Sequence, residues 1–164
     1  MAQDTGNIQI REMIETDLLK VINIDTEISD DERTPTWPFS FESYWQLYRP
    51  DIHLVAELEG EIVGFVVGNI VEEEHNQSLA TLPRMLADFN IHRHRWVGWI
   101  DMIGVTPRYQ HKGIGRALVE EFLVECKRNN AVMRGFVREG DERLEKFLKA
   151  MGFRKWDFTI YEKS

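Results

Sequence analysis

The stretch "VTPRYQHKGIGRALVEEF", residues Val105–Phe122, predicts the end of a strand, a polar turn and the start of a helix. A polar and basic segment ends at Lys112, and Gly113 and Gly115 then stand where the helix should begin. Glycine weakens a helix, so two of them at this point need a reason. Glycine is favoured where another molecule must approach the backbone closely. We therefore expect a ligand at this turn.

A phosphate group suits the start of this predicted helix. The first turn of a helix leaves backbone N–H groups unpaired and carries a partial positive charge. Side chains that add positive charge surround the two glycines; they are Arg108, His111, Lys112 and Arg116. Two common phosphate loops are excluded by spacing, because Arg116 follows Gly115 where a P-loop needs lysine, and Leu118 stands where a dinucleotide loop needs a third glycine.

The segments around the turn predict a β-α-β unit. The runs "WVGWIDMIGV" (96–105) and "AVMRGFV" (131–137) have the composition of strands. The predicted helix between them carries one apolar stripe, formed by Ile114, Leu118, Phe122 and Cys126. We therefore expect the two strands to be parallel, with a right-handed crossover.

A hairpin precedes this unit and makes the rest of the sheet antiparallel. Two β-rich runs flank Glu59 and Gly60, which form a good turn pair. Gly64 and Gly68 inside the second run indicate a bulge or a close backbone approach. The other expected elements are a strand at 8–13, a helix capped by Thr16, a helix at 40–48, a helix that Gly152 ends, and a strand at 155–163.

Length and composition indicate one globular domain. The 164 residues predict a single domain, 1–164, with a motif-free insertion at about 71–95. Hydrophobic and charged fractions of 43% and 29% are those of soluble proteins. Cys126 is the single cysteine, which excludes an intrachain disulfide and fits a cytoplasmic location. We expect neither a signal peptide nor a membrane helix, since no apolar run approaches about 18 residues.

The net charge of −8 indicates which kinds of binding partner to expect. Phosphate backbones attract lysine and arginine, so nucleic acid is not expected as a partner. An acidic surface tolerates or attracts cationic ligands such as amines.

The sequence from Gln110 to Gly115, "QHKGIG", resembles the central motif of the GNAT superfamily of acyl-CoA-dependent N-acyltransferases. In that motif, glutamine or arginine is followed after two residues by glycine, any residue, and glycine or alanine. The flanking segments resemble the family in the same order; they are "IQIREMIETDLLKVINID", "EGEIVGFVVG", "IGVTPRY" and "FLKAMGF". The resemblance covers nearly the whole chain except residues 71–95.

The resemblance implies an α/β fold in three layers and a binding mode for coenzyme A. A mixed, mostly antiparallel central sheet with a splayed parallel strand pair would carry helices on both faces. Backbone N–H groups from His111 to Gly115 would hold the pyrophosphate, and the pantetheine arm would pair with the strand edge from Met102 to Val105, where Gly104 would allow a bulge. The implied coenzyme A residues are Ile103, Gly104, Val105, Gln110, His111, Lys112, Gly113, Ile114, Gly115 and Arg116.

Asp101 is the expected catalytic base. It is an ionisable residue in an apolar strand, at a position where some family members carry a base. The alternative is a structural aspartate paired with Arg134, Arg138 or the backbone. A backbone N–H at 103–105 would stabilise the oxyanion. The tyrosine that serves many relatives as the general acid is replaced here by Leu148, which leaves Tyr109, Tyr161 and water as alternatives.

Trp37, Phe39 and Trp99 are the expected acceptor-binding residues, although aromatic side chains are more often core. Asp141 stands where many relatives have an asparagine near the pantetheine arm, and it also fits a helix N-cap. No metal is expected, because the histidines lack cysteine or acidic partners at matching spacing; they are His75, His92 and His94.

The resulting hypothesis is an N-acetyltransferase that moves an acetyl group directly from acetyl-CoA to a primary amine. The acceptor is left open among a small-molecule amine, a peptide N-terminus and a protein lysine. The non-enzymatic alternative is a coenzyme-A-binding sensor or partner module. Related domains often form homodimers.

Overall fold

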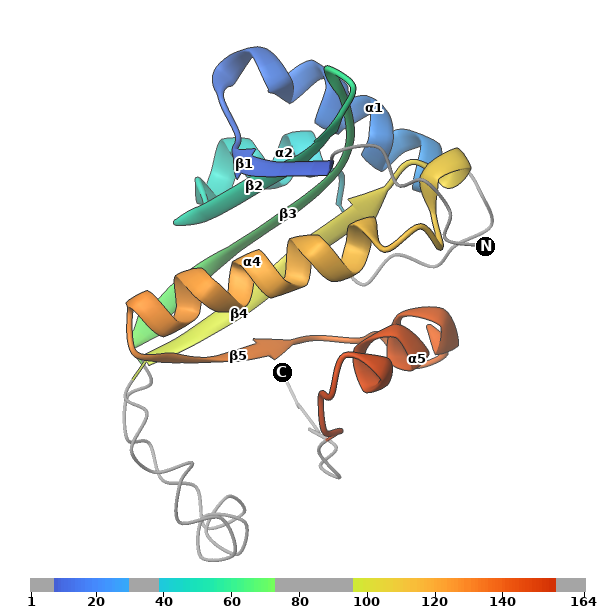
Figure 1. Cartoon of the computed structure of the whole chain (residues 1–164). Helices are drawn as coiled ribbons and strands as arrows, with labels where there is room; N and C mark the ends of the chain where they lie inside the picture. Colours follow the sequence, from blue (N-terminus) through green and yellow to red (C-terminus); the bar gives the residue numbers. More distant parts are fainter. Residues whose placement is uncertain (1–7, 30–38, 73–95, 156–164) are drawn as a thin grey trace, which may run out of the picture.

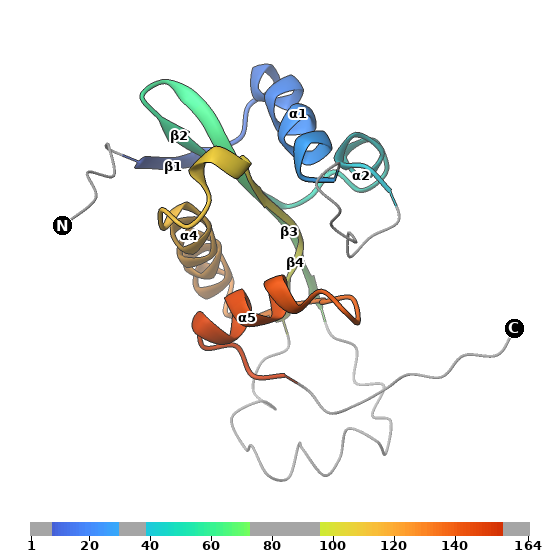
Figure 2. The same cartoon turned by 90° about the vertical axis from the view of Figure 1, so that its right-hand side faces the viewer.

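The structure, a computed structural model, describes residues 8–29, 39–72 and 96–155. A central sheet lies between two sets of helices (Figures 1 and 2). Helices α1 (Leu18–Ser29) and α2 (Phe41–Tyr48) cover one face, and α4 (Ile114–Arg128) crosses the other. The expected three-layer α/β architecture is therefore confirmed.

Five strands form the sheet in the order β1-β2-β3-β4-β5. They are β1 (Ile8–Glu12), β2 (Ile52–Leu58), β3 (Glu61–Glu72), β4 (Trp96–Val105) and β5 (Ala131–Gly135). Neighbours from β1 to β4 are antiparallel, whereas β4 and β5 are parallel and joined through α4. This is the mixed, mostly antiparallel sheet that the sequence predicts.

Each face of the sheet has its own apolar core. The α4 stripe is fully buried against β2, β3 and β4; it consists of Ile114, Leu118, Phe122 and Cys126. On the other face, α1 and α2 bury apolar side chains against Val55, Phe65 and Val67. Helix α5 (Glu142–Ala150) follows β5 and adds Phe147 to the α4-side core. The spacing of the apolar residues therefore predicts which face of each helix is buried.

The predicted turns and helix ends are mostly observed. Glu59 and Gly60 both have positive φ, 51° and 82°, as a tight hairpin turn requires. The Ser40 hydroxyl accepts a hydrogen bond from the Ser43 N–H at 3.3 Å and caps α2. Gly152, with φ of 87°, follows α5 and ends it.

The prediction that Thr16 caps the first helix is wrong. It lies exposed inside a short 3-10 turn, η1 (Glu15–Asp17), and α1 begins at Leu18. The carboxylate of Asp17 takes the capping role instead and accepts from the Ile14 N–H at 2.9 Å. A carboxylate is preferred here because it also pairs with Arg11 from β1.

Two predictions fall largely outside the described residues. The final strand at 155–163 has only Lys155 inside them, and the predicted insertion at 71–95 has only its first two residues inside. Those two, Val71 and Glu72, continue β3.

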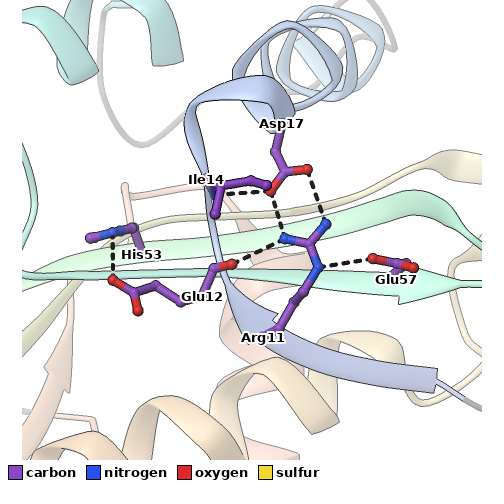
Figure 3. A network of polar contacts seen from close by, with 6 residues as sticks. All are labelled: Arg11, Glu12, Ile14, Asp17, His53 and Glu57. Carbon is purple, nitrogen blue, oxygen red and sulfur yellow. Dashed lines mark hydrogen bonds and ion pairs between the residues drawn. The ribbon is translucent and has the colours of Figure 1, made fainter.

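Arg11 joins β1, β2 and η1 through one network of ion pairs (Figure 3). Its guanidinium binds both oxygens of Asp17 at 2.7 and 3.0 Å, and its Nε donates to Glu57 at 2.8 Å. Asp17 is only 6% exposed. The hydrogen bonds from Arg11 hold the pKa of the Asp17 carboxyl below its usual range, although burial opposes this. The carboxylate form is therefore part of the folded structure.

We predict that Asp17→Ala lowers the free energy of unfolding at pH 7 by about 2–3 kcal/mol, because it leaves Arg11 half-paired and Ile14 uncapped. A carboxyl with a lowered folded pKa stabilises the fold above its unfolded pKa of about 3.9 and loses this effect as the pH falls further. Urea denaturation should therefore give a difference between wild type and variant that shrinks below about pH 4. Thr16→Ala, the exposed neighbour, should change stability by less than about 0.5 kcal/mol. Equal losses for the two variants would contradict this account.

Candidate functional site

The parallel strands β4 and β5 separate halfway along β4. Their pairing runs from Trp96 opposite Ala131 to Ile100 opposite Gly135. Strand β4 continues to Val105, whereas β5 has ended (Figure 1). Among the described residues, no strand lies beside the 101–105 edge of β4, so its backbone can pair with an extended ligand. The splayed pair expected from the sequence is observed.

A β-bulge at Asp101 lies where this separation begins. Val67 of β3 pairs with Met102 of β4 and Gly68 pairs with Ile100, so Asp101 is the extra residue. The bulge breaks the alternation of β4: Ile100 and Ile103 both contact the α4-side core, whereas Met102 contacts the core beneath α1 and α2. A bulge re-aims a side chain at a sheet position where regular alternation would not place it.

The glycines of the sheet behave partly as predicted. At Gly68 the expected close backbone approach is confirmed, because a Cβ there would lie 1.9 Å from the Trp99 carbonyl oxygen. At Gly64 the expected bulge is confirmed, since a register shift leaves Val63 extra beside it. At Gly104, where a bulge was expected, β4 pairs with β3 in regular register. The bulge of β4 lies three residues earlier, at Asp101. Gly104 has a packing role instead, because a Cβ there would lie 2.7 Å from side-chain atoms of Ile28 and Phe65.

The carboxylate of Asp101 is held by two neutral donors. The Tyr44 hydroxyl of α2 donates to Oδ2 at 2.7 Å, and the Asn69 amide of β3 donates to the same oxygen at 2.8 Å. Burial, and then the neighbouring Asp101 carboxylate, raises the pKa of Tyr44 above its usual range, so this phenol stays protonated as a donor.

Sequence reasoning identified Asp101 but missed both partners. Two signals were present. Asn69 is a polar residue inside an apolar strand. Tyr44 lies on the aromatic face of a predicted helix, and its hydroxyl would need a hydrogen-bond partner if buried. Their meeting depends on the packing of α2 over the β3–β4 pair, which spacing along the chain does not reveal.

A cleft with a volume of about 70 Å³ opens beside Asp101, where β4 and β5 diverge. Its floor comes from Ile100 to Ile103, and its far wall from Phe136 and Leu148. The other lining residues are Asp25, Ile28, Ser29, Phe65, Val119, Gly135 and Leu144. A mostly apolar cleft with a carboxylate at one side suits a small acyl group and a reacting amine.

The glycine turn lies between the end of β4 and the start of α4. Gly113 caps α4 with φ of 83°, a left-handed conformation that favours glycine, and His111 also has positive φ, 61°. Gly115 has no such need, since a Cβ there would be 3.4 Å from Phe147, an ordinary contact. Neither conformation nor packing requires glycine at Gly115.

The charges around this turn suit an anion. The first turn of α4 contains no acidic residue. Lys112 and His111 are exposed, and the Lys112 ammonium lies 5.0 Å from the Tyr109 ring. Arg116 is 3.8 Å from Glu120, and the charge of Arg108 is offset by an ion pair with Glu61. The positive charge of the site therefore comes mainly from Lys112, Arg116 and the helix itself.

Gln110 fixes the turn to its surroundings. Its amide Nε2 donates to the Val105 carbonyl at 2.9 Å, and its Oε1 accepts from Arg143 of α5. The side chain thus ties the end of β4 to α5 around the turn. Arg143 is a further residue that the sequence did not single out.

Trp99 and Phe39, the two predicted acceptor residues that the structure describes, contact different parts of the molecule. Trp99 stacks on Phe136 with ring centroids 4.3 Å apart, and Phe136 lines the cleft. Phe39 stacks on Tyr48 with ring centroids 6.3 Å apart and packs against the core beneath α1 and α2, and it is not among the residues that line the described cleft. Trp37 lies outside the described residues.

The remaining candidates have structural positions. The Asp141 carboxylate accepts from the Leu144 N–H at 3.0 Å, so its N-cap interpretation is confirmed. Leu148 lines the cleft where many relatives carry an acid, and Tyr109 packs against the α4-side core. Groups of three or more metal-ligating side chains are not found in the described ranges, and His75, His92 and His94 lie outside them. None of the helices in those ranges could span a membrane.

Cys126 is fully buried against Gly98, and burial raises the pKa of its thiol to about 11. We predict that the folded protein reacts with DTNB at least about 100-fold more slowly than the urea-unfolded protein, because little thiolate is present and the sulfur is inaccessible. The measurement is the absorbance change after mixing at pH 8. A stoichiometric burst from the folded protein would contradict this prediction.

Comparison with known proteins agrees with this geometry. A family model described as "Acetyltransferase (GNAT) family" matches residues 21–153. The solved structure of aminoglycoside N-acetyltransferase AAC(6')-Iy in complex with CoA has a TM-score of 0.70 at 15% identity, over 100% of this chain and 99% of that one. Aminoglycoside 6'-N-acetyltransferase AAC(6')-IG from Acinetobacter haemolyticus gives 0.69 at 15% identity, over 95% of this chain and 97% of that one.

A protein with a peptide ligand has the same fold. Arabidopsis thaliana Naa50 in complex with the bisubstrate analogue CoA-Ac-MVNAL has a TM-score of 0.63 at 18% identity, over 92% of this chain and 85% of that one. A search of curated protein sequences finds no match. At these identities the likeness to solved structures concerns the fold.

Proposed function

Because the chain belongs to the GNAT acetyltransferase family, we propose that it is an acetyl-CoA-dependent N-acetyltransferase that transfers the acetyl group directly to a primary amine. The observation that carries this proposal is the juxtaposition of three features within one stretch of chain. A carboxylate at Asp101, a strand edge at 103–105 that no described strand covers, and a glycine turn at a helix start follow one another along β4 and α4.

The proposed donor site is the edge of β4 together with the start of α4. Backbone N–H groups from His111 to Gly115 would bind the pyrophosphate, with Lys112 and Arg116 nearby. The backbone from Ile103 to Val105 would pair with the pantetheine arm. Gly115 supports this assignment, since a Cβ there would meet Phe147 and Val105 only at ordinary contact distances, so the protein's own packing does not require glycine.

The proposed chemistry needs one base and one oxyanion donor. The amine nitrogen forms a bond to the thioester carbonyl carbon, and the carbon–sulfur bond breaks. Asp101 takes the proton of the amine, directly or through a water molecule, because a protonated amine has no lone pair with which to attack. A backbone N–H at 103–105 stabilises the oxyanion, and the leaving sulfur receives its proton from solvent, since Leu148 cannot supply one.

The proposed acceptor is a cationic amine that approaches from the side of Phe136 and Trp99. Asp25 and Asp101 both line the cleft, and the chain has a net charge of −8, so an ammonium group is attracted to it. The acceptor wall would include Trp99, together with Trp37 and Phe39 from the α1–α2 segment. The solved relatives point to two acceptor types for testing, an aminoglycoside and a peptide N-terminus.

The second candidate function is a coenzyme-A-binding module without catalytic activity. Leu148 in the cleft favours it, because an apolar side chain replaces the acid that many relatives carry there. Asp101 and its two hydrogen-bond donors favour an enzyme, since a binding module needs no carboxylate in the cleft.

Release of coenzyme A thiol from acetyl-CoA separates the two functions. The assay uses wild-type protein with kanamycin, the peptide Met-Val-Asn-Ala-Leu, a lysine-containing peptide and n-butylamine as separate acceptors. We expect amine-dependent release with at least one of them. Stabilisation by coenzyme A without release from any acceptor would favour the binding module.

A further inference from the structure

We propose that Tyr44 and Asn69 are positioning residues that hold the Asp101 carboxylate in its reactive orientation. This inference rests on the proposed function, since it assigns a task to the neighbours of the proposed base. Both residues donate to the same oxygen, Oδ2, from two different elements, α2 and β3. Two donors on one oxygen fix the plane of the carboxylate as well as its place.

The Asn69 amide is itself held by its neighbours. Its Oδ1 accepts from the Asp51 N–H at 3.2 Å, so its amide nitrogen points toward Asp101. The Asp51 carboxylate in turn accepts from the Ile70 N–H at 3.0 Å. The turn before β2 therefore sets the orientation of Asn69.

Tyr44 is fixed by aromatic packing. It is 3% exposed and lies between Phe41 and Tyr48, with ring centroids at 6.4 and 5.4 Å. Its hydroxyl also accepts from the Asn69 amide at 3.2 Å, so the three side chains form a closed set of hydrogen bonds. Neither Tyr44 nor Asn69 lines the described cleft, so they act through Asp101.

The bulge makes this support necessary. Asp101 is the extra residue of the bulge, so the register of β3 against β4 does not set its direction as it sets those of Ile100 and Met102. A carboxylate on an irregular backbone would sample several rotamers, and a base that must meet an amine proton needs a single one. The hydrogen bonds from Tyr44 and Asn69 restrain the carboxylate to one orientation.

Both of these partners are neutral, which matters for a base. Neutral donors hold the carboxylate without pairing its charge, so the group remains able to accept a proton. Other charged groups act on the same region: Asp25 of α1 in the cleft, Asp51 near Tyr44, and Arg134 of β5 at 5.8 Å from the Trp99 ring. These groups are the same in wild type and in the Tyr44 and Asn69 variants, so they do not cause a difference between them.

The test is a kinetic comparison of Tyr44→Phe, Asn69→Ala and wild type from pH 5 to 9. Thiol release is followed with the most active amine of the panel and with water alone as acceptor. We expect each variant to lower kcat about 10-fold at every pH tested, with the KM for acetyl-CoA unchanged. Tyr48→Phe, which removes an exposed hydroxyl one turn along α2, should match wild type.

A double-mutant cycle with Asp101→Asn distinguishes positioning from general structural damage. Once Asp101 has lost its charge, Tyr44→Phe should have little further effect on kcat, because it acts through that carboxylate. An equal loss of kcat in the wild-type and Asp101→Asn backgrounds, or a wild-type kcat for Tyr44→Phe, would overturn the inference alone. Full activity of Asp101→Asn would remove the proposed base, and absence of thiol release by wild type would overturn the proposed function with it.

Discussion

Asp101→Asn should lower kcat about 10²–10³-fold while leaving the affinity for coenzyme A unchanged. The asparagine has nearly the same shape and cannot take a proton from the amine. Its oxygen can still accept from Tyr44 and Asn69, so the bulge and the cleft should persist. The measurement is steady-state thiol release at saturating amine, together with a calorimetric titration of coenzyme A.

Asp25→Asn is the matched control for this change. It removes the same charge from the same cleft, and its side-chain oxygen can still accept from the Phe41 N–H. If the cleft charge only attracts a cationic acceptor, both variants should raise the KM for the amine by similar amounts. A large fall in kcat restricted to Asp101→Asn would identify the base, and equal kcat values for Asp101→Asn and wild type would exclude it.

Gly115→Glu should weaken coenzyme A binding about 100-fold or more without loss of stability. A glutamate in the first turn of α4 has better helix propensity than glycine and interacts favourably with the helix dipole. The same side chain fills the space above the helix start and repels a pyrophosphate. Folding and ligand binding are therefore expected to change in opposite directions, which random structural damage would not produce.

Val124→Glu provides the control for charge. Val124 is 37% exposed on the same helix, nine residues on, or about 13 Å along the axis. That exceeds the screening length of roughly 10 Å at 0.1 M salt. Coenzyme A affinity should be close to that of wild type in Val124→Glu, and unchanged affinity in Gly115→Glu would contradict the proposed pyrophosphate site.

Local patterns predicted the elements of this fold well. The α4 stripe, the Glu59-Gly60 turn and the Gly152 stop depend on residues close together in the chain, and all are observed. The error at Thr16 has a tertiary cause. Asp17 replaced it as the capping group because Arg11, on a different element, pairs with that carboxylate.

The candidate site was predictable in part. The glycine turn and Asp101 lie on one continuous stretch, so their order along β4 and α4 followed from the sequence. The bulge at Asp101 depends on the register of β3 against β4, and the contacts of Tyr44 and Asn69 depend on where α2 packs. The Arg143 bond to Gln110 likewise joins residues 33 positions apart, so no local pattern indicates it.

A calorimetric titration of coenzyme A into the wild-type protein tests the central claim most directly, because it requires neither a known acceptor nor turnover. The account predicts saturable binding at one site per chain, with a dissociation constant of roughly 1 μM–1 mM. Absence of saturable heat up to millimolar coenzyme A would contradict the assignment of the β4 edge and the α4 start as an acetyl-CoA site.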